Sequence, residues 1–356
     1  MPTHQLLDYI IIGQGLAGSA LALKLLARNK KLLVVDQPEK NTSSLVAAGL
    51  FNPITGRKMV RTWMVDKLFP ALHTHYRLAE TLTGNTFFYP MPIYRPFTSV
   101  EEQNEWMGKS PAKEFLSYVS EVYTRSAFEG VRDEFGGLLL KGCGYLDTRR
   151  YLDSVRTLLQ RDAQFLDEYF SDKELNVDKD GVTYKNYRAG KAVFCNGTHS
   201  SDWFGWLPIK PLKGEAILIK DGPPQGVIIN RGVYVVPTLS GKWRVGATYN
   251  YGDLSPGVTE PSKRELTDRL QELVKFPFTV GGQEWGFRPT TPDRRPILGR
   301  HPASASVWTL NGLGTKGVSL APYFADHLID AMENGQALNK EVDIERYKLL
   351  YWTSPR

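Results

Sequence analysis

The first 36 residues alternate between two strongly apolar segments and one glycine-rich turn. Leu7–Ile12 is a short β-prone run. The pattern G-x-G-x-x-G follows it directly, with its glycines at Gly13, Gly15 and Gly18. Apolar residues then recur at helical spacing until a second apolar run, Lys31–Asp36. This order predicts a β-α-β unit whose turn from strand to helix can receive the pyrophosphate of a dinucleotide.

Each glycine of this turn has a separate physical role. Gly13 allows the tight turn, Gly15 lets the backbone approach a pyrophosphate, and Gly18 allows close packing of helix on strand. The helix N-terminus presents free N–H groups and a positive dipole end to phosphates. Asp36, at the end of the second run, can accept hydrogen bonds from ribose hydroxyls. The alternative is a glycine turn in an ordinary α/β domain, and the motif leaves the choice between NAD and FAD open.

Composition indicates an ordinary globular chain with about two domains. The 356 residues are 42% hydrophobic, 12% aromatic and 23% charged, which excludes a disordered, collagen-like or coiled-coil chain. There are 44 Lys and Arg against 38 Asp and Glu, a formal net charge of +6. No run of five basic residues occurs, so we interpret this charge as an aid to solubility before a nucleic-acid footprint.

The cysteines and the N-terminal segment bear on the compartment. Cys143 and Cys195 lie far apart and form no C-x-x-C pair, so neither a disulfide scaffold nor a thiolate zinc site is expected. Residues 6–26 are rich in apolar side chains, but they also contain charged residues and glycines, which makes a poor membrane span. They also lack the basic start of a signal peptide. We expect no membrane span, no metal site and a cytoplasmic location.

The rest of the chain alternates between helical and β-rich stretches. Residues 41–56 are expected to form a loop, residues 98–140 show no clear motif, and strand follows strand between residues 216 and 249. The order predicts a dinucleotide domain whose chain leaves, builds a second domain and returns. Other predicted elements are a helix within Asp66–Leu82, a helix capped by Asp147 or Thr148, a hairpin over Gly181–Asn196, a strand at Trp308–Leu310, and a helix over Val318–Met332 with Pro322 near its first turn.

Several segments resemble D-amino-acid oxidases and glycine oxidases. Val46–Pro53 (VAAGLFNP) resembles the loop after the second strand in D-amino-acid oxidases. Gly286–Asp293 (GFRPTTPD) looks like their G-x-R-P segment, and Pro296–Pro302 is similar to glycine oxidases in particular. Gly312–Pro322 (GLGTKGVSLAP) looks like the closing flavin loop and helix of the family. Further similar segments, in the order that the family has, are Pro211–Glu215, Tyr234–Pro237 and Val245–Thr248.

The resemblance implies an α/β fold in which a Rossmann-type FAD-binding domain is interleaved with an antiparallel-sheet substrate domain. The expected FAD-binding domain comprises residues 1–88, 142–210 and 286–356, and the expected substrate domain comprises residues 89–141 and 211–285. Some relatives attach flavin to a cysteine at the position of Gly286, so noncovalent FAD is expected here.

The resemblance also implies which residues hold the cofactor. The backbone of Ala47–Leu50 would lie along the flavin, Asn196-Gly197 would approach it closely, and Gly312–Gly317 would cover the pyrimidine end of its ring. A helix from Gly317 would direct N–H groups and a positive dipole at the same place, although this loop can also be a glycine-rich cap on a core helix. The expected cofactor-binding residues are Gly13, Gly15, Leu16, Ala17, Gly18, Asp36, Ser44, Ala47, Ala48, Gly49, Leu50, Asn196, Gly197, Gly312, Leu313, Gly314, Thr315, Lys316 and Gly317.

Three residues are expected to act on the substrate. Arg288 matches an arginine that binds the substrate carboxylate in the resembled oxidases, and a guanidinium can do this through two parallel hydrogen bonds. Its alternative role is a structural ion pair with Asp293. Tyr234 matches a tyrosine near the substrate, but it can equally pack on a sheet face. Lys316 can replace the arginine that glycine oxidases carry at the position of Thr315, or it can be solvated.

Other polar residues receive structural interpretations. Arg57, Lys58 and Arg61 can bind an anion, but a solvated basic turn is the preferred interpretation. His199 and His301 have no partner at metal-ligand spacing and are expected to be structural. Glu215 is expected to orient backbone rather than to act in catalysis.

The expected function is FAD-dependent oxidation of the C–N bond of a small amino acid or N-substituted glycine, by hydride transfer to flavin N5. Oxygen, a quinone or another carrier would accept the electrons. One alternative is a flavin enzyme of tRNA wobble-uridine modification, which acts on a carboxymethylamino group. A second alternative is a non-catalytic flavin-binding subunit. An NAD-dependent dehydrogenase is disfavoured by the C-terminal flavin loop.

Overall fold

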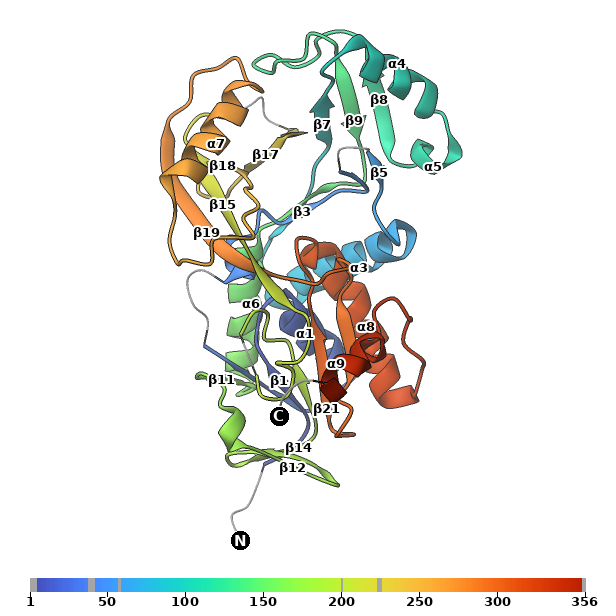
Figure 1. Cartoon of the computed structure of the whole chain (residues 1–356), viewed down its shortest axis with the longest axis vertical. Coiled ribbons are helices and arrows are strands. Elements are labelled where there is room, and N and C mark those ends of the chain that lie inside the picture. The colour runs from blue at the N-terminus through green and yellow to red at the C-terminus, as the bar shows by residue number, and fades with distance from the viewer. Residues whose placement is uncertain (1–4, 38–41, 57–58, 200, 223–225, 354–356) are drawn as a thin grey trace.

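A computed structural model describes residues 5–37, 42–56, 59–199, 201–222 and 226–353. Figure 1 shows two parts stacked along the long axis of the molecule, each built around a sheet. The lower part combines blue, green and red segments, whereas the upper part combines teal, yellow and orange ones (Figure 1). The chain therefore passes between the two parts several times, as the predicted interleaving requires.

The lower sheet is mainly parallel and grows from the N-terminal β-α-β unit. Its strand order is β11-β2-β1-β14-β13-β12, and β21 pairs in parallel with β14 and antiparallel with β20. Strands β1, β2, β11 and β14 are parallel, and β12 and β13 add an antiparallel edge. The bounds are β1(Gln5–Ile12), β2(Leu32–Asp36), β11(Phe165–Asp167), β12(Leu175–Asp178), β13(Gly181–Tyr184), β14(Tyr187–Phe194), β20(Ile297–Arg300) and β21(Val307–Asn311).

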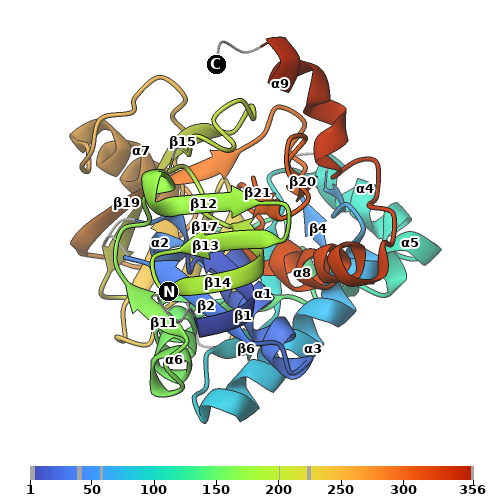
Figure 2. The same ribbon diagram turned by 90° about the horizontal axis from the view of Figure 1, so that it is seen from below.

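The apolar run of β1 serves two cores because neighbouring side chains of a strand point to opposite faces. Ile11 packs in the core that also holds side chains of α1, α3, α6 and α8. Ile10 and Ile12 pack in the core on the other face, with Phe194 and Phe204. Figure 2 shows α1, α3 and α8 together on one side of the sheet. These helices are α1(Leu16–Ala27), α3(Val65–Thr83), α6(Thr148–Arg161) and α8(Gly317–Asn334).

The upper sheet is separate and mainly antiparallel. Its order is β19-β15-β18-β17-β16-β7-β9-β8, with one parallel pair, β16 with β7. Helix α7(Glu260–Gln271) packs on its outer face through Leu266 and Leu270, and α4(Val100–Lys109) and α5(Lys113–Leu116) lie near its β8 edge (Figure 1). The strand bounds are β7(Ile93–Pro96), β8(Val119–Tyr123), β9(Gly137–Leu140), β15(Lys210–Ile219), β16(Ile228–Arg231), β17(Val233–Pro237), β18(Trp243–Gly246) and β19(Val280–Thr290).

The α/β class with a parallel Rossmann-like sheet and a separate antiparallel sheet confirms the fold that the sequence predicted. The predicted N-cap of α6 is also correct, because the Asp147 side chain accepts a hydrogen bond from the backbone N–H of Arg150. The predicted hairpin forms as β13 and β14.

Two local predictions are wrong. The segment 41–56 was expected to be a loop, but residues 42–56 contain a helical turn and two short strands, β3, which pairs with the distant β10, and β4, which pairs with the nearby β5. Hydrophobic periodicity does not reveal such short elements. Pro322 lies beyond the first turn of α8, whose first residue is Gly317. The remaining elements are α2(Ser43–Val46), β3(Leu50–Phe51), β4(Ile54–Thr55), β5(Val60–Arg61), β6(Phe88–Pro90), β10(Gly144–Leu146), η1(Asp172–Glu174), η2(Ile344–Tyr347) and α9(Lys348–Thr353).

None of the helices in the described ranges is both long enough and apolar enough to cross a membrane.

Candidate active site between the two sheets

A cavity of about 2400 Å³ lies between the two parts and is lined by residues of both. Pockets for drug-sized ligands commonly measure roughly 300–1000 Å³. This cavity therefore has room for a dinucleotide together with a second small molecule. Every predicted cofactor-binding and substrate residue except Gly18 borders it.

At one end of the cavity, the glycine turn brings α1 close to β1. A β-carbon on Gly18 would lie 1.9 Å from the carbonyl oxygen of Gly13, so no larger residue allows this approach. Gly13 itself has a φ of +98°, which favours glycine. At the helix N-terminus, the N–H of Leu16 donates to the hydroxyl of Ser44, at 3.2 Å. The first backbone N–H group of α1 thus lies at the cavity, beside the hydroxyl of Ser44, which is one of the predicted cofactor-binding residues.

Asp36 ends β2 and borders the same end of the cavity. Burial raises the pKa of its carboxyl, and the backbone N–H of Gln14 and the charge of Arg156 act in the opposite direction. Arg156 is held there by the Gln14 side chain, whose oxygen accepts from Nε at 3.1 Å and from Nη2 at 2.9 Å. Sequence reasoning missed Arg156, which lies far from the glycine motif along the chain, and Gln14, which occupies a non-glycine position within it.

The segment Ala47–Leu50, which is expected to lie along the flavin, is fixed by contacts from both parts. The carbonyl oxygen of Ala47 accepts from Nη1 of Arg244 at 2.9 Å and from the hydroxyl of Thr148 at 3.3 Å. Gly49 has a φ of +74°, and a β-carbon there would lie 1.8 Å from the carbonyl oxygen of Leu146. The backbone along this wall of the cavity is therefore closely constrained.

Asn311 joins two of the predicted cofactor segments. Its amide nitrogen donates to Oδ1 of Asn196 at 3.2 Å and to the carbonyl oxygen of Gly197 at 3.0 Å. Its amide oxygen accepts from the N–H of Gly312, at 2.8 Å. Asn311 was not predicted, although an asparagine at the end of a strand just before a glycine loop could have indicated this role.

Lys316 precedes α8 and is half-buried at the cavity. Its ammonium donates to the hydroxyl of Thr55, at 3.2 Å. Burial lowers the pKa of Lys316, and the charges of Arg295 and Arg294 lower it further. This corner of the cavity therefore carries a concentrated positive charge.

Arg288 extends from β19 over the neighbouring strand β15. Its guanidinium lies against Gly214, where a β-carbon would be 2.2 Å from Nη2. Nη1 donates to the carbonyl oxygen of Thr248 at 3.2 Å, and the guanidinium stacks over the ring of Tyr249, 4.9 Å from its centroid. Within the described ranges it makes no ion pair.

The expected alternative for Arg288, an ion pair with Asp293, is wrong. Asp293 instead pairs with Nε of Arg346, at 3.0 Å. Arg288 is therefore a cation at the cavity wall whose charge no carboxylate in the described part of the chain balances, and an anion can bind it.

Tyr234 lies on the same face of the upper sheet. The pairing of Tyr234 with Gly246, of Gly246 with Ala216 and of Ala216 with Glu284 defines a row across four strands. Arg288 shares this face because it lies four residues after Glu284 on β19. Burial raises the pKa of Tyr234 to about 12, while the nearby charge of Arg288 lowers it. The ring packs against the apolar core, and the residue also borders the cavity.

Several other sequence-based assignments have clear structural outcomes. Arg57 and Lys58 lie outside the described residues, whereas Arg61 pairs with Asp66 and is therefore not a simply solvated residue. His301 is buried among aromatic rings, and burial lowers its pKa to about 4. His199 is exposed at the cavity edge. Within the described ranges, no group of three or more His, Cys, Asp or Glu residues could hold a metal.

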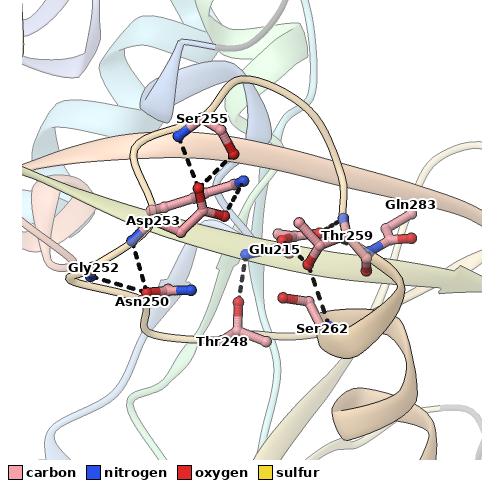
Figure 3. A network of polar contacts seen from close by, with 10 residues as sticks. Glu215, Thr248, Asn250, Gly252, Asp253, Ser255, Thr259, Ser262 and Gln283 are labelled. Carbon is pink, nitrogen blue, oxygen red and sulfur yellow. Dashed lines mark hydrogen bonds and ion pairs between the residues drawn. The ribbon is translucent and has the colours of Figure 1, made fainter.

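A buried polar network at the rim fixes the loop that follows β18 (Figure 3). The carboxylate of Glu215 accepts from the N–H and the hydroxyl of Thr259, both at 2.8 Å, and from the amide of Gln283 at 2.7 Å. Lys213 is 1% exposed and donates to Asp253 at 2.7 Å. These contacts hold both ends of the loop that carries Tyr249. Only Glu215 was considered from the sequence, since the partners lie far away along the chain.

Comparison with known proteins gives a family match over most of the chain. The model of the family described as FAD dependent oxidoreductase matches residues 8–331. The bifunctional protein ThiO/ThiG of Synechocystis sp. is 26% identical over 353 residues, which cover 91% of this chain and 51% of that protein. The tRNA 5-methylaminomethyl-2-thiouridine biosynthesis bifunctional protein MnmC of Marinobacter nauticus is 24% identical over 355 residues, which cover 90% of this chain and 54% of that protein. The chain thus spans about half the length of these curated relatives.

A solved structure supports the fold. The crystal structure of glycine oxidase from Geobacillus kaustophilus superposes with a TM-score of 0.78 at 20% sequence identity. The match covers 97% of this chain and 98% of that one. At this identity the likeness shows the shared fold alone.

Proposed function

Because the chain belongs to the family of FAD-dependent oxidoreductases, we propose that it binds FAD noncovalently and oxidises the C–N bond of a small amino acid or N-substituted glycine. The FAD-binding domain would comprise residues 1–88, 142–210 and 286–356, and the remainder would form the substrate domain. Oxygen, a quinone or another carrier would accept the electrons.

The cavity lining fits FAD in shape and chemistry. A β-carbon on Gly197 would meet no atom within 4 Å, so the backbone there faces open space. The N-termini of α1 and α8 both border the cavity, and such ends favour phosphate and other anions. Cys195 also borders the cavity, but burial raises the pKa of its thiol, which disfavours the thiolate needed for a covalent link. When bound, FAD would supply at its N5 atom the acceptor for one hydride, which carries both electrons.

The side chains of the upper sheet would bind and orient the substrate. Arg288 would hold the carboxylate through its guanidinium N–H groups. The Tyr234 hydroxyl stays protonated at neutral pH and can donate a hydrogen bond to the same group. Lys316 and the first N–H groups of α8 would stabilise negative charge at the other side of the cavity.

The proposed reaction balances with water as the second reactant. The Cα–H bond breaks and its hydrogen leaves with both electrons, while the lone pair of the neutral amine forms a C=N bond. Water then hydrolyses this imine to an oxo acid and an amine or ammonia. The side chains named above align the amine and balance charge, and the proposal requires no separate acid–base pair.

One observation carries this proposal most strongly. Arg288 borders the cavity, and no ion pair balances its charge within the described ranges. An arginine held flat by a glycine and a tyrosine ring is ready to bind a planar carboxylate.

The first test is an absorption spectrum of the purified protein, followed by anaerobic addition of glycine, sarcosine, D-amino acids, proline and a tRNA with a carboxymethylaminomethyl uridine. We expect a flavin spectrum that one of the small amines bleaches. Bleaching by the tRNA alone would select wobble-uridine modification, which the likeness to the Marinobacter nauticus protein supports. A flavin that no amine reduces would favour a non-catalytic flavin-binding subunit.

The Arg288→Ala variant tests the carboxylate contact directly. Loss of a charged hydrogen-bonded pair costs ~2 kcal/mol or more, so the substrate dissociation constant should rise at least about 30-fold. Bound flavin should remain, and the exposed-site control Arg264→Ala should behave as wild type. Wild-type substrate affinity in Arg288→Ala would remove Arg288 from the site.

A further inference from the structure

A second arginine at the cavity also has a poorly balanced charge. Arg95 lies on β7, borders the cavity and exposes 14% of its side chain. Its Nε is buried without a hydrogen-bond partner. Its one ion pair within the described ranges is a 4.0 Å contact with Glu102. Burial lowers the pKa of Arg95 to about 10, and the charge of Arg231 adds to this effect.

At neutral pH Arg95 is therefore still charged, and a buried charge without a good partner is costly. Such groups usually indicate a bound ion, ligand or water that completes the site.

Arg231 lies beside Arg95 and makes the closer contact with Glu102, the carboxylate that both arginines share. Its Nη1 pairs with Glu102 at 2.6 Å, and its Nη2 donates to the hydroxyl of Thr98 at 2.8 Å. Glu102 also accepts from the backbone N–H of Thr98, at 3.0 Å. Two guanidinium groups thus share one carboxylate. Both arginines border the cavity, so this part of its wall carries an excess positive charge.

Strand register places Arg95 on the face that carries Arg288 and Tyr234. Asn230 pairs with Tyr234, and Ile228 pairs with Ile93 in the parallel pair of β16 and β7. Arg95 and Asn230 each lie two residues further along these strands and therefore share that face.

The two arginines are well separated across the sheet. Five strand steps separate β19 from β7, and the Arg288 guanidinium lies over β15, so four steps of about 4.8 Å, roughly 19 Å across the strands, remain between it and β7. A ligand that reaches both Arg288 and Arg95 must therefore be extended.

FAD does not account for this pair of arginines. The glycine turn and Asp36, which would receive the pyrophosphate and ribose, belong to the lower sheet. Arg95 and Arg231 belong to the upper sheet, on the strands around Tyr234. Arg95 shares the face of Tyr234, so its charge lies in the substrate part of the cavity, and Arg231 meets it at the carboxylate of Glu102.

We propose that Arg95 and Arg231 form a second anion subsite, and that the substrate is an N-substituted glycine whose extended N-substituent ends in a carboxylate or phosphate group. This inference rests on the proposed function, because it assigns the glycine carboxylate to Arg288. It extends that function by making the far end of the substrate a determinant of specificity.

The test compares matched substrates that differ only at the far end. N-octylglycine, N-(7-carboxyheptyl)glycine and N-(7-phosphonoheptyl)glycine, whose longer chains suit the separation of the two arginines, are titrated anaerobically, and the dissociation constant is taken from the saturation of flavin reduction. We expect wild type to bind one of the charged compounds about tenfold more tightly than the neutral one, as for a charged hydrogen bond. The better of the two charged compounds identifies carboxylate or phosphate as the natural group.

Three variants assign the preference to this subsite. Arg95→Gln should abolish it, whereas Glu102→Gln should increase it, because it removes the shared negative charge. The control Arg264→Gln, on the exposed face of α7, should leave it unchanged. Arg95→Gln should not lower the melting temperature, since it removes a mostly buried charge whose ion pair with Glu102 is long; a structural arginine would give a clear decrease.

Two results overturn the inference while leaving the proposed function intact: equal binding of neutral and charged compounds by wild type, or an unchanged preference in Arg95→Gln. If no glycine derivative reduces the flavin, the proposed function fails instead. The subsite is then tested by calorimetric titration of the FAD-loaded protein with inorganic phosphate and with glutarate. Binding that Arg95→Gln loses and Glu102→Gln strengthens supports the subsite, and no binding of either anion overturns it.

Discussion

The Arg288 guanidinium occupies space that is free because residue 214 of the neighbouring strand is a glycine. A β-carbon on Gly214 would lie 2.2 to 2.3 Å from the guanidinium atoms. The backbone of Gly214 has no positive φ, so the constraint on this residue is space rather than conformation. Because the end of an arginine side chain is flexible, a larger residue should move the guanidinium and leave the fold intact.

Gly214→Ala should therefore weaken substrate binding without touching a substrate-binding residue. We expect the substrate dissociation constant to rise about tenfold or more, because the charged hydrogen bonds are misaligned. FAD content and melting temperature should stay close to wild type. Gly282→Ala, on β19, is the matched control, since a β-carbon there makes an ordinary 3.4 Å contact with Leu218. Equal substrate affinity in both variants would show that the guanidinium position does not matter.

At the residue scale, the sequence indicated the chemical role of a side chain better than it indicated which residues that side chain contacts. Arg288 and Tyr234 could be proposed from segments that resemble known oxidases. Arg95 could not, because a single arginine in a proline-rich segment carries no local signal. The poor balance of its charge becomes visible only when β7, β16 and α4 are brought together, because Arg95 and Arg231 then share one carboxylate.

Helix α8 contains a proline in its interior, and a side chain from another helix replaces the hydrogen bond that this proline cannot make. Pro322 has no N–H to donate to the carbonyl oxygen of Val318, one turn earlier. The hydroxyl of Tyr76, from α3, donates to this carbonyl at 3.0 Å. Tyr76 is fully buried, so water cannot replace it. The contact links α3 to the end of α8 that borders the cavity.

Tyr76→Phe should therefore destabilise the protein by ~1 kcal/mol or more, because it leaves a buried carbonyl unpaired. In the Pro322→Ala background the helix supplies its own N–H, and the same change should cost less. Thermal unfolding of the four proteins in this double-mutant cycle measures the difference. An identical cost in both backgrounds would contradict the link between the proline and the tyrosine.

Short elements were the least predictable. The segment 41–56 was expected to be a loop, but β3 pairs with β10 from a distant part of the chain, and β4 pairs with β5. Two-residue strands leave no periodic pattern, so their pairing depends on tertiary contacts. The long helices and β1 were predicted closely because their apolar periodicity is sustained.

Across the whole molecule, polar contacts at the cavity link the upper sheet and helix α8 to the segment that contains Ala47 and Thr55. Arg244 of the upper sheet donates to the carbonyl oxygen of Ala47 and pairs with Glu284 at 2.8 Å. Lys316, at the end of α8, reaches Thr55. These contacts set the position of the proposed flavin wall relative to the proposed substrate face.

Arg244→Met should weaken FAD binding by roughly tenfold, since the Ala47 carbonyl loses a charged donor. Fluorescence titration of the apoprotein with FAD measures this change. Arg188→Gln is a suitable control, because Arg188 pairs with Asp178 in the lower sheet, away from the cavity. Unchanged FAD affinity in Arg244→Met would show that this bridge does not position the wall.

The sequence by itself determined the β-α-β unit, the glycine turn and the α/β class, because these depend on local periodicity and on backbone freedom at fixed positions. Only the tertiary structure decided which charges are balanced. It paired Asp293 with Arg346 and left Arg288 and Arg95 facing a common cavity. The physical reason is that ion pairing and burial depend on residues far apart in the chain, such as Glu102 and Arg231, whose proximity no local pattern encodes.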